Sequence, residues 1–536
     1  CVSTIAWPSR WSSAGPSCRR AIRLRTLRVQ TSPELGRYLT AAADLTPGTT
    51  LLSEKPLVFA PKAMPDPEAS MPCVGCYTPV LTDVGERCVS CGWPVCSGNC
   101  PGIKDPKHHG LECLVLSARP ECVLDNMADY YRHDALLTLR CVLLQKSEPD
   151  NWKKLLDMQS HMESRSPGNE AYDEANEFIV EYLMNQFIEN LDSDVKNKYL
   201  PEISSELLHR ICGIIDTNAL EIRLSEGAEL LALYPKVYLL EHSCIPNTKH
   251  TFSLKPKDGS IYKITLKVVV PIAKGEHIAT MYSHALWGTQ ARRQHLKDTK
   301  YFSCKCIRCS DPTEMGTYLS ALKCLGDDNK PCDGIHLAED PLDDETDWAC
   351  SKCAVKVSNS EVSMVISQMG EEVENVQMMG GSVPMLENLL CRLSTFLHPN
   401  HYHLYSIKHS LVQLYGRQPG YISKDFLDKK IKMCTDLIKI TKTLDPGNAR
   451  LSLYSSVLHH ELCSALVIKS KATNNSLSKE ADDMKQFLCE AKIAVDEALN
   501  ALKDDIEESS GQKLYSVIEE SKKDLERLCK ENKIVL

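Results

Sequence analysis

The feature that most constrains the fold is a dense run of metal-binding residue types between positions 73 and 113. Within these 41 residues the chain places seven cysteines and one histidine at ligand spacing, enough for two tetrahedral zinc sites. A segment this short cannot bury a core of its own, so its folding energy must come from bound metal. His108 lies outside the ligand spacing and is expected to be exposed. The closely spaced pairs are Cys73 and Cys76, Cys88 and Cys91, Cys96 and Cys100, and His109 and Cys113.

The whole chain of 536 residues contains 25 cysteines, many of them in short C-x-x-C pairs. In a large chain this spacing favours zinc in a reducing compartment over a disulfide scaffold. We therefore expect an intracellular protein, in the cytoplasm or the nucleus. A net charge of −9 argues against a nucleic-acid partner, because nucleic-acid binders usually carry a basic surplus. No apolar run approaches the ~18 residues that span a bilayer, so we expect no direct membrane contact.

A second group of cysteines needs a ligand from a distant part of the chain. Cys304, Cys306 and Cys309 supply three thiols, whereas a structural zinc site needs four ligands. Cys244, in the stretch "LLEHSCIPN", is the candidate for the fourth, and one ion would then link the two segments. A third group can be either a zinc site or a set of reduced, partly buried thiols: Cys324, Cys332, Cys350 and Cys353.

Several motifs resemble those of one enzyme family. "HSCIPN", then "KGEHIATMY", then C-x-C-x2-C resemble the SET domain of protein-lysine methyltransferases with its post-SET zinc, and the ligand order in residues 73–113 resembles the MYND finger. A SET domain split by a MYND finger is typical of the SET and MYND domain family. "LGRYLTA", "GIIDTNALEI", "ALWGTQARRQHL" and "HPNHYHLYSIKHSLVQLYG" are similar to its arthropod SmydA-like branch, over residues 28 to about 465. The resemblance implies interleaved ligand sets: Cys73, Cys76, Cys96 and Cys100 for one ion, and Cys88, Cys91, His109 and Cys113 for the other.

The resemblance implies an α+β fold. A β-rich SET domain is split by a MYND zinc finger and a helical insertion; a post-SET zinc module and an all-α, tetratricopeptide-like C-terminal domain follow. Residues 1–33 hold six arginines and no acid, as transit peptides do, but residues 1–25 are expected to be an unstructured leader or an artefact of the gene model. The expected boundaries are 26–72 and 214–283 for the SET domain, 73–113 for the finger, 114–213 for the insertion, 284–312 for the post-SET module, 313–355 for a further cysteine-rich segment and 356–536 for the helical domain.

The residues after position 360 predict helices by themselves. Leu404, Ile407, Leu411 and Leu414 recur at helical spacing, and Gly416 ends the run. Helical pairs in series predict a tetratricopeptide-like array, although no clear 34-residue repeat is visible. In the family such a domain closes over the SET cleft; partner binding or stabilisation of the scaffold is equally compatible with these residues.

The resemblance also implies a catalytic site. Tyr282, at the end of "GEHIATMY", occupies the family's catalytic tyrosine position. A tyrosine hydroxyl suits methyl transfer because it can hydrogen-bond a lysine amine without carrying a full charge, and positioning supplies much of the rate. The implied cofactors are S-adenosylmethionine and three structural zinc ions, with a fourth if the third cysteine group binds metal. The implied contacts of S-adenosylmethionine are Gly36, Arg37, Asn218, Glu241, His242 and Phe302.

Three positions depart from the family pattern. Tyr38 stands where a second glycine is usual, Glu241 replaces an asparagine, and His277 replaces an acid. A carboxylate can only accept hydrogen bonds, so Glu241 removes a donor, although it would attract the cofactor's ammonium and sulfonium. The first hypothesis is a protein-lysine N-methyltransferase acting on histone or non-histone proteins. The alternative is a weak or inactive SET-fold adaptor that uses its finger, with a proline-rich peptide partner, and its helical domain. A monomer is expected in either case.

Overall fold

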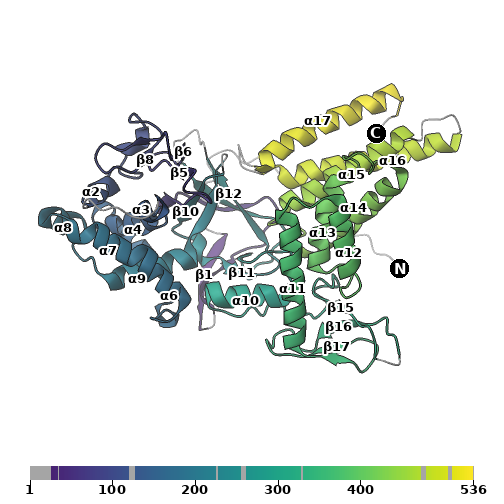
Figure 1. Cartoon of the computed structure of the whole chain (residues 1–536), viewed down its shortest axis with the longest axis horizontal. Coiled ribbons are helices and arrows are strands. Elements are labelled where there is room, and N and C mark those ends of the chain that lie inside the picture. Colours follow the sequence, from purple (N-terminus) through teal and green to yellow (C-terminus); the bar gives the residue numbers. More distant parts are fainter. Residues whose placement is uncertain are drawn as a thin grey trace.

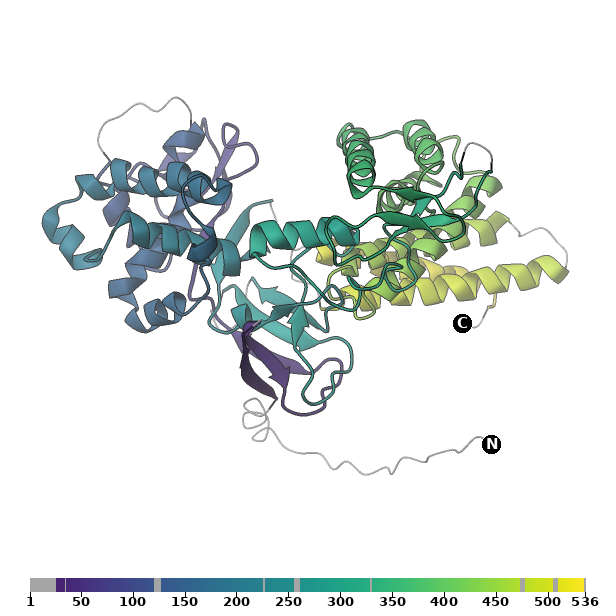
Figure 2. The same cartoon turned by 90° about the horizontal axis from the view of Figure 1, so that it is seen from below.

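The computed structural model describes residues 26–33, 35–119, 127–224, 227–254, 261–327, 330–472, 478–504 and 510–534. The expected leader, residues 1–25, lies outside the described residues. A β-rich centre lies between two helical regions, one formed by α3 to α9 and the other by α11 to α17 (Figure 1). The view turned by 90° shows the same three-part arrangement (Figure 2).

The β-rich centre consists of short sheets whose strands come from both sides of the helical insertion. In β13 the buried residues Ile264, Leu266 and Val268 alternate with partly exposed ones, as expected for a sheet with one face on the core. Strand β13 lies between β12 and β3, β10 lies between β4 and β9, β1 pairs with β2, and β11 pairs in parallel with β14. The bounds are β1 Leu27–Ser32, β2 Gly36–Ala41, β3 Thr50–Glu54, β4 Val58–Pro61, β9 Leu220–Arg223, β10 Glu229–Leu233, β11 Glu241–His242, β12 Thr248–Ser253, β13 Lys263–Val268 and β14 Ala279–Thr280.

The segment of paired cysteines forms only very short elements. Its strands pair as two hairpins, β5 with β6 and β7 with β8. Strands of two or three residues contribute little stability, so the fold of this finger must depend on its ligand clusters. The bounds are β5 Ser70–Pro72, β6 Pro79–Leu81, β7 Glu86–Arg87, β8 Pro94–Val95, η2 Pro101–Ile103 and α2 Glu112–Leu116.

The helical insertion packs around α4. Every residue of α4 from Ala135 to Leu144 is buried, which is typical of a helix covered on all sides. Helix α9 contacts α4 and returns the chain to the sheets. The bounds are α3 Met127–Tyr130, α4 Ala135–Ser147, α5 Pro149–Leu156, η3 Met162–Ser164, α6 Glu170–Ala175, the π-helical turn η4 Asn176–Glu181, α7 Tyr182–Gln186, η5 Ile188–Asn190, α8 Ser193–Tyr199 and α9 Ser205–Asn218.

The predicted α+β class with an all-helical C-terminal region is confirmed. Leu404, Ile407 and Leu411 are fully buried on one face of α13, as their spacing predicts.

No helix within the described ranges is long and apolar enough to cross a membrane. The remaining bounds are η6 Val237–Leu239, α10 Thr289–Lys300, β15 Leu322–Lys323, β16 Ile335–Ala338, β17 Trp348–Cys350, β18 Lys356–Val357, α11 Asn359–Met378, α12 Val383–Leu393, α13 Tyr402–Leu414, α14 Lys424–Leu444, α15 Ser452–Ala472, α16 Ser478–Leu502 and α17 Ser510–Glu531.

Candidate catalytic and metal sites

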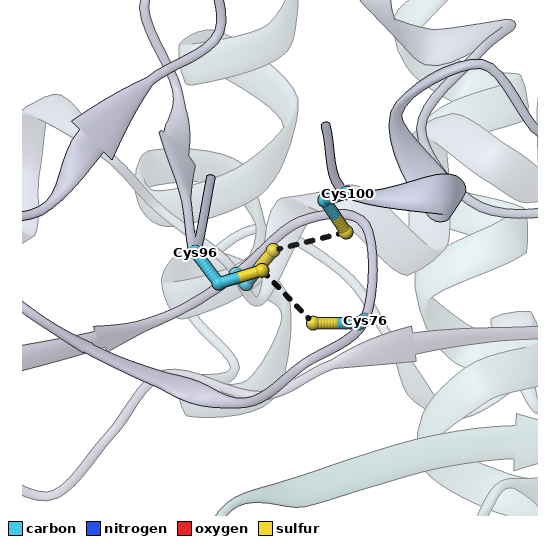
Figure 3. A group of neighbouring side chains, drawn as sticks. Cys76, Cys96 and Cys100 are labelled. Carbon is cyan, nitrogen blue, oxygen red and sulfur yellow. Dashed lines mark hydrogen bonds between the residues drawn. The ribbon is translucent and has the colours of Figure 1, made fainter. Parts of the chain in front are cut away.

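The structure brings the cysteines and His109 of the finger into two interleaved clusters. Within each cluster the ligand atoms lie within 4.8 Å of one another. Tetrahedral Zn–S bonds of about 2.3 Å separate sulfur atoms by about 3.8 Å. The Sγ atoms of Cys73 and Cys100 are 3.8 Å apart and those of Cys76 and Cys96 are 3.5 Å apart. Figure 3 shows the thiols of Cys76, Cys96 and Cys100 turned toward one another. The sets are those that the resemblance implies: Cys73, Cys76, Cys96 and Cys100, and Cys88, Cys91, His109 and Cys113.

A buried carboxylate orients the histidine of the second cluster. Glu112 Oε1 lies 2.9 Å from His109 Nδ1, which leaves Nε2 of the ring facing the cluster, 3.2 Å from Cys91 Sγ. Both oxygens of Glu112 also accept hydrogen bonds from Arg140, at 2.7 and 2.9 Å. Burial alone would raise the pKa of the Glu112 carboxyl, but the charge of Arg140 holds it below its ordinary value. A carboxylate placed behind a histidine in this way fixes the ring orientation that a metal ion needs.

Arg140 fastens the finger to the rest of the protein. It lies on α4, and besides Glu112 it donates to the carbonyl oxygens of Phe59 and Val74 and to the hydroxyl of Tyr77. That hydroxyl in turn lies 2.8 Å from His108 Nδ1, and the two rings are stacked. The expectation that His108 is exposed is therefore wrong: it is half-buried, because the buried phenol of Tyr77 holds it inward. Sequence reasoning also missed Glu112, although an acid three residues after a histidine ligand was a usable signal.

The third cluster joins the two distant segments as expected. Cys244 Sγ lies 3.5 Å from Cys309 Sγ and 4.0 Å from Cys304 Sγ, and Cys306 completes the group. Sequence reasoning missed Arg292, which is 0% exposed and donates to Cys244 Sγ at 3.3 Å and to Cys309 Sγ at 3.5 Å. Four thiolates around Zn²⁺ leave a net charge of −2, which a buried guanidinium partly neutralises.

Glu314 in turn balances the buried charge beside this cluster. Its Oε2 accepts from Arg292 at 2.7 Å and from Arg308 at 3.0 Å. Burial alone would raise the pKa of Glu314, but the two guanidinium groups lower it to about 2, so the carboxylate is ionised. Glu314 therefore separates two like charges that would otherwise repel each other in a buried place.

Tyr282 is connected to the third cluster through His242. The Tyr282 hydroxyl donates to the carbonyl oxygen of Leu240, and its backbone N–H donates to His242 Nδ1 at 2.9 Å. The other ring nitrogen of His242 lies 3.2 Å from Cys244 Sγ. Burial raises the pKa of Tyr282, and the nearby Glu241 raises it further, so the phenol keeps its proton at neutral pH.

The expected cofactor residues lie in two groups. Phe302, with 36% of its surface exposed, lies beside His242 with ring centroids 5.8 Å apart. Arg37 and Asn218 instead meet at the segment 157–159: Arg37 donates to the Asp157 carboxylate at 2.5 Å, and Asn218 Nδ2 donates to the Gln159 carbonyl at 2.8 Å. Gly36, which begins β2, has a φ of +63°, a conformation that favours glycine.

The three departures from the family pattern form one cluster. The ring of Tyr38 stacks on His277, and His277 Nδ1 pairs with Glu241 Oε1. The second oxygen, Glu241 Oε2, is buried and has no hydrogen-bond partner within the described part of the chain. Burial raises the pKa of Glu241, and His277 opposes this shift. A buried oxygen that can only accept hydrogen bonds, and that has no donor beside it, is suited to a cationic ligand.

Comparison with known proteins finds relatives over most of the chain, although no family model matches it. The SET domain-containing protein SmydA-8, isoform B, of Drosophila melanogaster is 32% identical over 333 residues, which are 61% of this chain and 66% of that protein. The histone-lysine N-methyltransferase ASHR1 of Arabidopsis thaliana is 25% identical and is covered over 68% of its length. A SET and MYND domain-containing protein of Dictyostelium discoideum is 23% identical, over 61% of this chain and 95% of that protein. This chain thus spans about two thirds of the length of the first two relatives.

Proposed function

Because the chain belongs to the SET and MYND domain family, we propose that it transfers a methyl group to the side-chain amine of lysine in a protein substrate, histone or non-histone. The observation that carries the proposal is the placement of Tyr282. Its hydroxyl is held on the Leu240 carbonyl beside two of the expected cofactor residues, Glu241 and His242. Relatives named as lysine methyltransferases support the same reaction.

The residues present fit S-adenosylmethionine. The unpartnered Glu241 Oε2 is an acceptor for a cationic group such as the cofactor's ammonium, and the exposed face of Phe302 can pack on a purine ring. Gly36 and Arg37 at the start of β2, with Asn218 and His242, complete the proposed binding set. When bound, S-adenosylmethionine supplies an electrophilic methyl group on a sulfonium.

The chain's own residues position the lysine amine. The protonated Tyr282 hydroxyl donates its hydrogen bond to the Leu240 carbonyl. Its oxygen can therefore accept a hydrogen bond from the lysine amine. Burial disfavours the ammonium form of the incoming lysine, and only the neutral amine has the lone pair that attacks the methyl carbon. With the cofactor bound, the amine nitrogen would form the new C–N bond as the C–S bond of the sulfonium breaks, and the methylated nitrogen would release a proton to water. Alignment of the amine beside the buried Tyr282 is the main contribution of the protein.

We also propose that the three clusters around residues 73–113 and 244–309 each hold a structural zinc ion. Every cluster offers four protein ligands, so no coordination position remains for a substrate or a reactive water. The thiols must stay reduced to bind zinc, so the proposal includes a reducing, intracellular compartment.

The cluster of Tyr38, His277 and Glu241 favours a second candidate function. If these side chains block the cofactor instead of binding it, the SET fold would serve as a scaffold. The finger, with a proline-rich peptide, and the helical region would then recruit partner proteins. The two candidates differ in whether the chain binds S-adenosylmethionine.

Calorimetry of the full chain with S-adenosylmethionine tests the proposal. We expect saturable binding with a 1:1 stoichiometry, and transfer of labelled methyl groups to histones or to proteins of a cell extract. Absence of binding at hundreds of micromolar cofactor, in protein that retains its zinc, would contradict the enzyme and leave the adaptor.

A further inference from the structure

The segment 322–357 is a small sheet built around four cysteines. Its strands pair antiparallel in the order β15, β16, β17, β18, and none is longer than four residues. Among the residues of this segment that the structure describes, 322–327 and 330–357, the buried side chains are those of Cys324, His336 and Trp348, too few to form a core. A sheet of this size needs another source of stability.

The distances between the four sulfur atoms match a metal site. Cys324 Sγ lies 3.6 Å from Cys353 Sγ, and Cys332 Sγ lies 3.7 Å from Cys350 Sγ. All four sulfurs lie within 4.8 Å of one another. These separations are close to the ~3.8 Å edge of a tetrahedral zinc–thiolate site and far above the ~2.05 Å of a disulfide bond.

The backbone around the cluster is arranged to stabilise thiolates. The N–H groups of Gly326, Gly334 and Lys352 each donate at 3.3 Å to the cysteine two residues earlier in the chain. Gly334 packs directly on the cluster, since a Cβ atom there would lie 2.5 Å from Cys350 Sγ and 3.2 Å from Cys332 Sγ. Donors aimed at sulfur stabilise the charged thiolate, which is the form that binds metal.

We propose that Cys324, Cys332, Cys350 and Cys353 bind a further structural zinc ion. Four thiolates in a closed tetrahedron select zinc among the common divalent metals of cells and leave no open position for catalysis. This proposal is independent of the proposed methyl transfer, because the site shares no residue with Tyr282 or the expected cofactor contacts.

The position of the sheet indicates what this ion stabilises. On one side, Arg293 of α10 donates to the Leu342 carbonyl and the Asp344 carboxylate, and its other nitrogen donates to the Cys304 carbonyl beside the third cluster. On the other side, the Lys323 N–H donates to the Phe396 carbonyl at 2.7 Å. Figure 1 shows β15 to β17 next to the helices α11 to α13. The zinc-bound sheet therefore connects the post-SET segment to the helical region, and we call this connection the bracket.

Zinc content of the full chain tests the site. We expect Cys353→Ser to carry one zinc ion fewer per chain than the parent, measured by plasma mass spectrometry. The matched control is Cys391→Ser, because Cys391 is exposed on α12 and belongs to none of the four clusters; it should leave the zinc content unchanged. Equal zinc content in the parent and Cys353→Ser would overturn the site. If Cys353→Ser is insoluble, the parent decides: four ions support the site and three or fewer overturn it.

Hydrogen exchange of the same proteins tests the bracket. In Cys353→Ser we expect faster exchange in β15 to β18 and also in α10 and the first turns of α11. Faster exchange confined to β15 to β18 would overturn the bracket and leave the zinc site. Neither readout requires S-adenosylmethionine or activity. If Cys353→Ser carries one zinc ion fewer and the parent does not bind S-adenosylmethionine, the zinc site stands and only the methyltransferase proposal is refuted.

Discussion

The ring of Tyr38 lies stacked on the imidazole of His277, with centroids 4.7 Å apart and planes inclined by 19°. His277 also pairs with Glu241, so these three residues act as one unit although Tyr38 and His277 lie far apart in the sequence. The acid at position 241, where the family pattern has an asparagine, thus has a compensating partner in His277. The proposed binding of S-adenosylmethionine would therefore depend on the charge of this unit as well as on its shape.

Tyr282→Phe should abolish most methyl transfer and leave S-adenosylmethionine binding unchanged. The change removes the hydroxyl that is held on Leu240 but none of the expected cofactor contacts. We expect a loss of about 10²–10³ in kcat, the size seen when one positioned polar group is removed from an active site. Tyr421→Phe in the helical region is the control. Wild-type turnover by Tyr282→Phe would show that another residue orients the amine.

Glu241→Gln should weaken binding of S-adenosylmethionine about tenfold. The substitution keeps the side-chain size but removes the charge from the buried, unpartnered oxygen. A hydrogen bond to a charged group contributes about 1.5–3 kcal/mol, and 1.4 kcal/mol corresponds to a factor of ten. Calorimetry measures the change, with Glu163→Gln on the surface as the control. Tighter binding by the Gln variant would mean that the carboxylate repels the cofactor.

Binding should also weaken as the pH falls, at a higher pH than for an ordinary glutamate. Burial raises the pKa of Glu241 above its ordinary 4.5, so the side chain gains a proton earlier during acidification. The stability of the fold changes in the opposite direction. Because the buried carboxylate is costly to ionise, the free energy of unfolding decreases as the pH rises through the raised pKa of Glu241. Affinity measured from pH 8 downward, with zinc content checked at each pH, should fall in the parent and stay level in Glu241→Gln.

Glu314→Gln should destabilise the post-SET region by about 3–5 kcal/mol, the usual cost of leaving buried charges unpaired. The variant leaves Arg292 and Arg308 facing each other without the anion between them. Denaturant unfolding measures the loss, and Glu339→Gln is the control because its pair with Lys356 is exposed. A change as small in Glu314→Gln as in the control would show that water or rearrangement replaces the carboxylate.

Glu112→Gln should loosen metal in the second cluster of the finger. His109 would lose the carboxylate that orients its ring, and a missing partner behind a ligand typically costs 10–100-fold in metal affinity. Release of zinc to a chelator should be faster than from Asp83→Asn, a surface change on the same finger. Equal release rates would mean that Arg140 and the backbone suffice to hold the ring.

Much of the cluster layout was predictable because ligand spacing is a local property. Cys88 and Cys91 come together through one tight turn, whatever the rest of the chain does. The missing fourth ligand pointed to Cys244 as the partner of Cys304, Cys306 and Cys309, and the α+β class followed from the family motifs. For the group around Cys324 the spacing could not decide between a zinc site and free thiols. Spacing alone contains no information on the distances between the sulfur atoms or on the backbone N–H groups that donate to them.

The partners of buried charges could not be read from the chain. Arg140 reaches Glu112, Phe59 and Val74 only because α4 packs against both the finger and β4. Arg292 reaches Glu314 only because the chain after α10 folds back onto that helix. His108 turned inward for the same reason. Short-range geometry thus sets which residues can share a metal ion. The neighbours of a buried ion or ring depend on which distant elements pack together, because desolvation forces each such group to find a partner across the core.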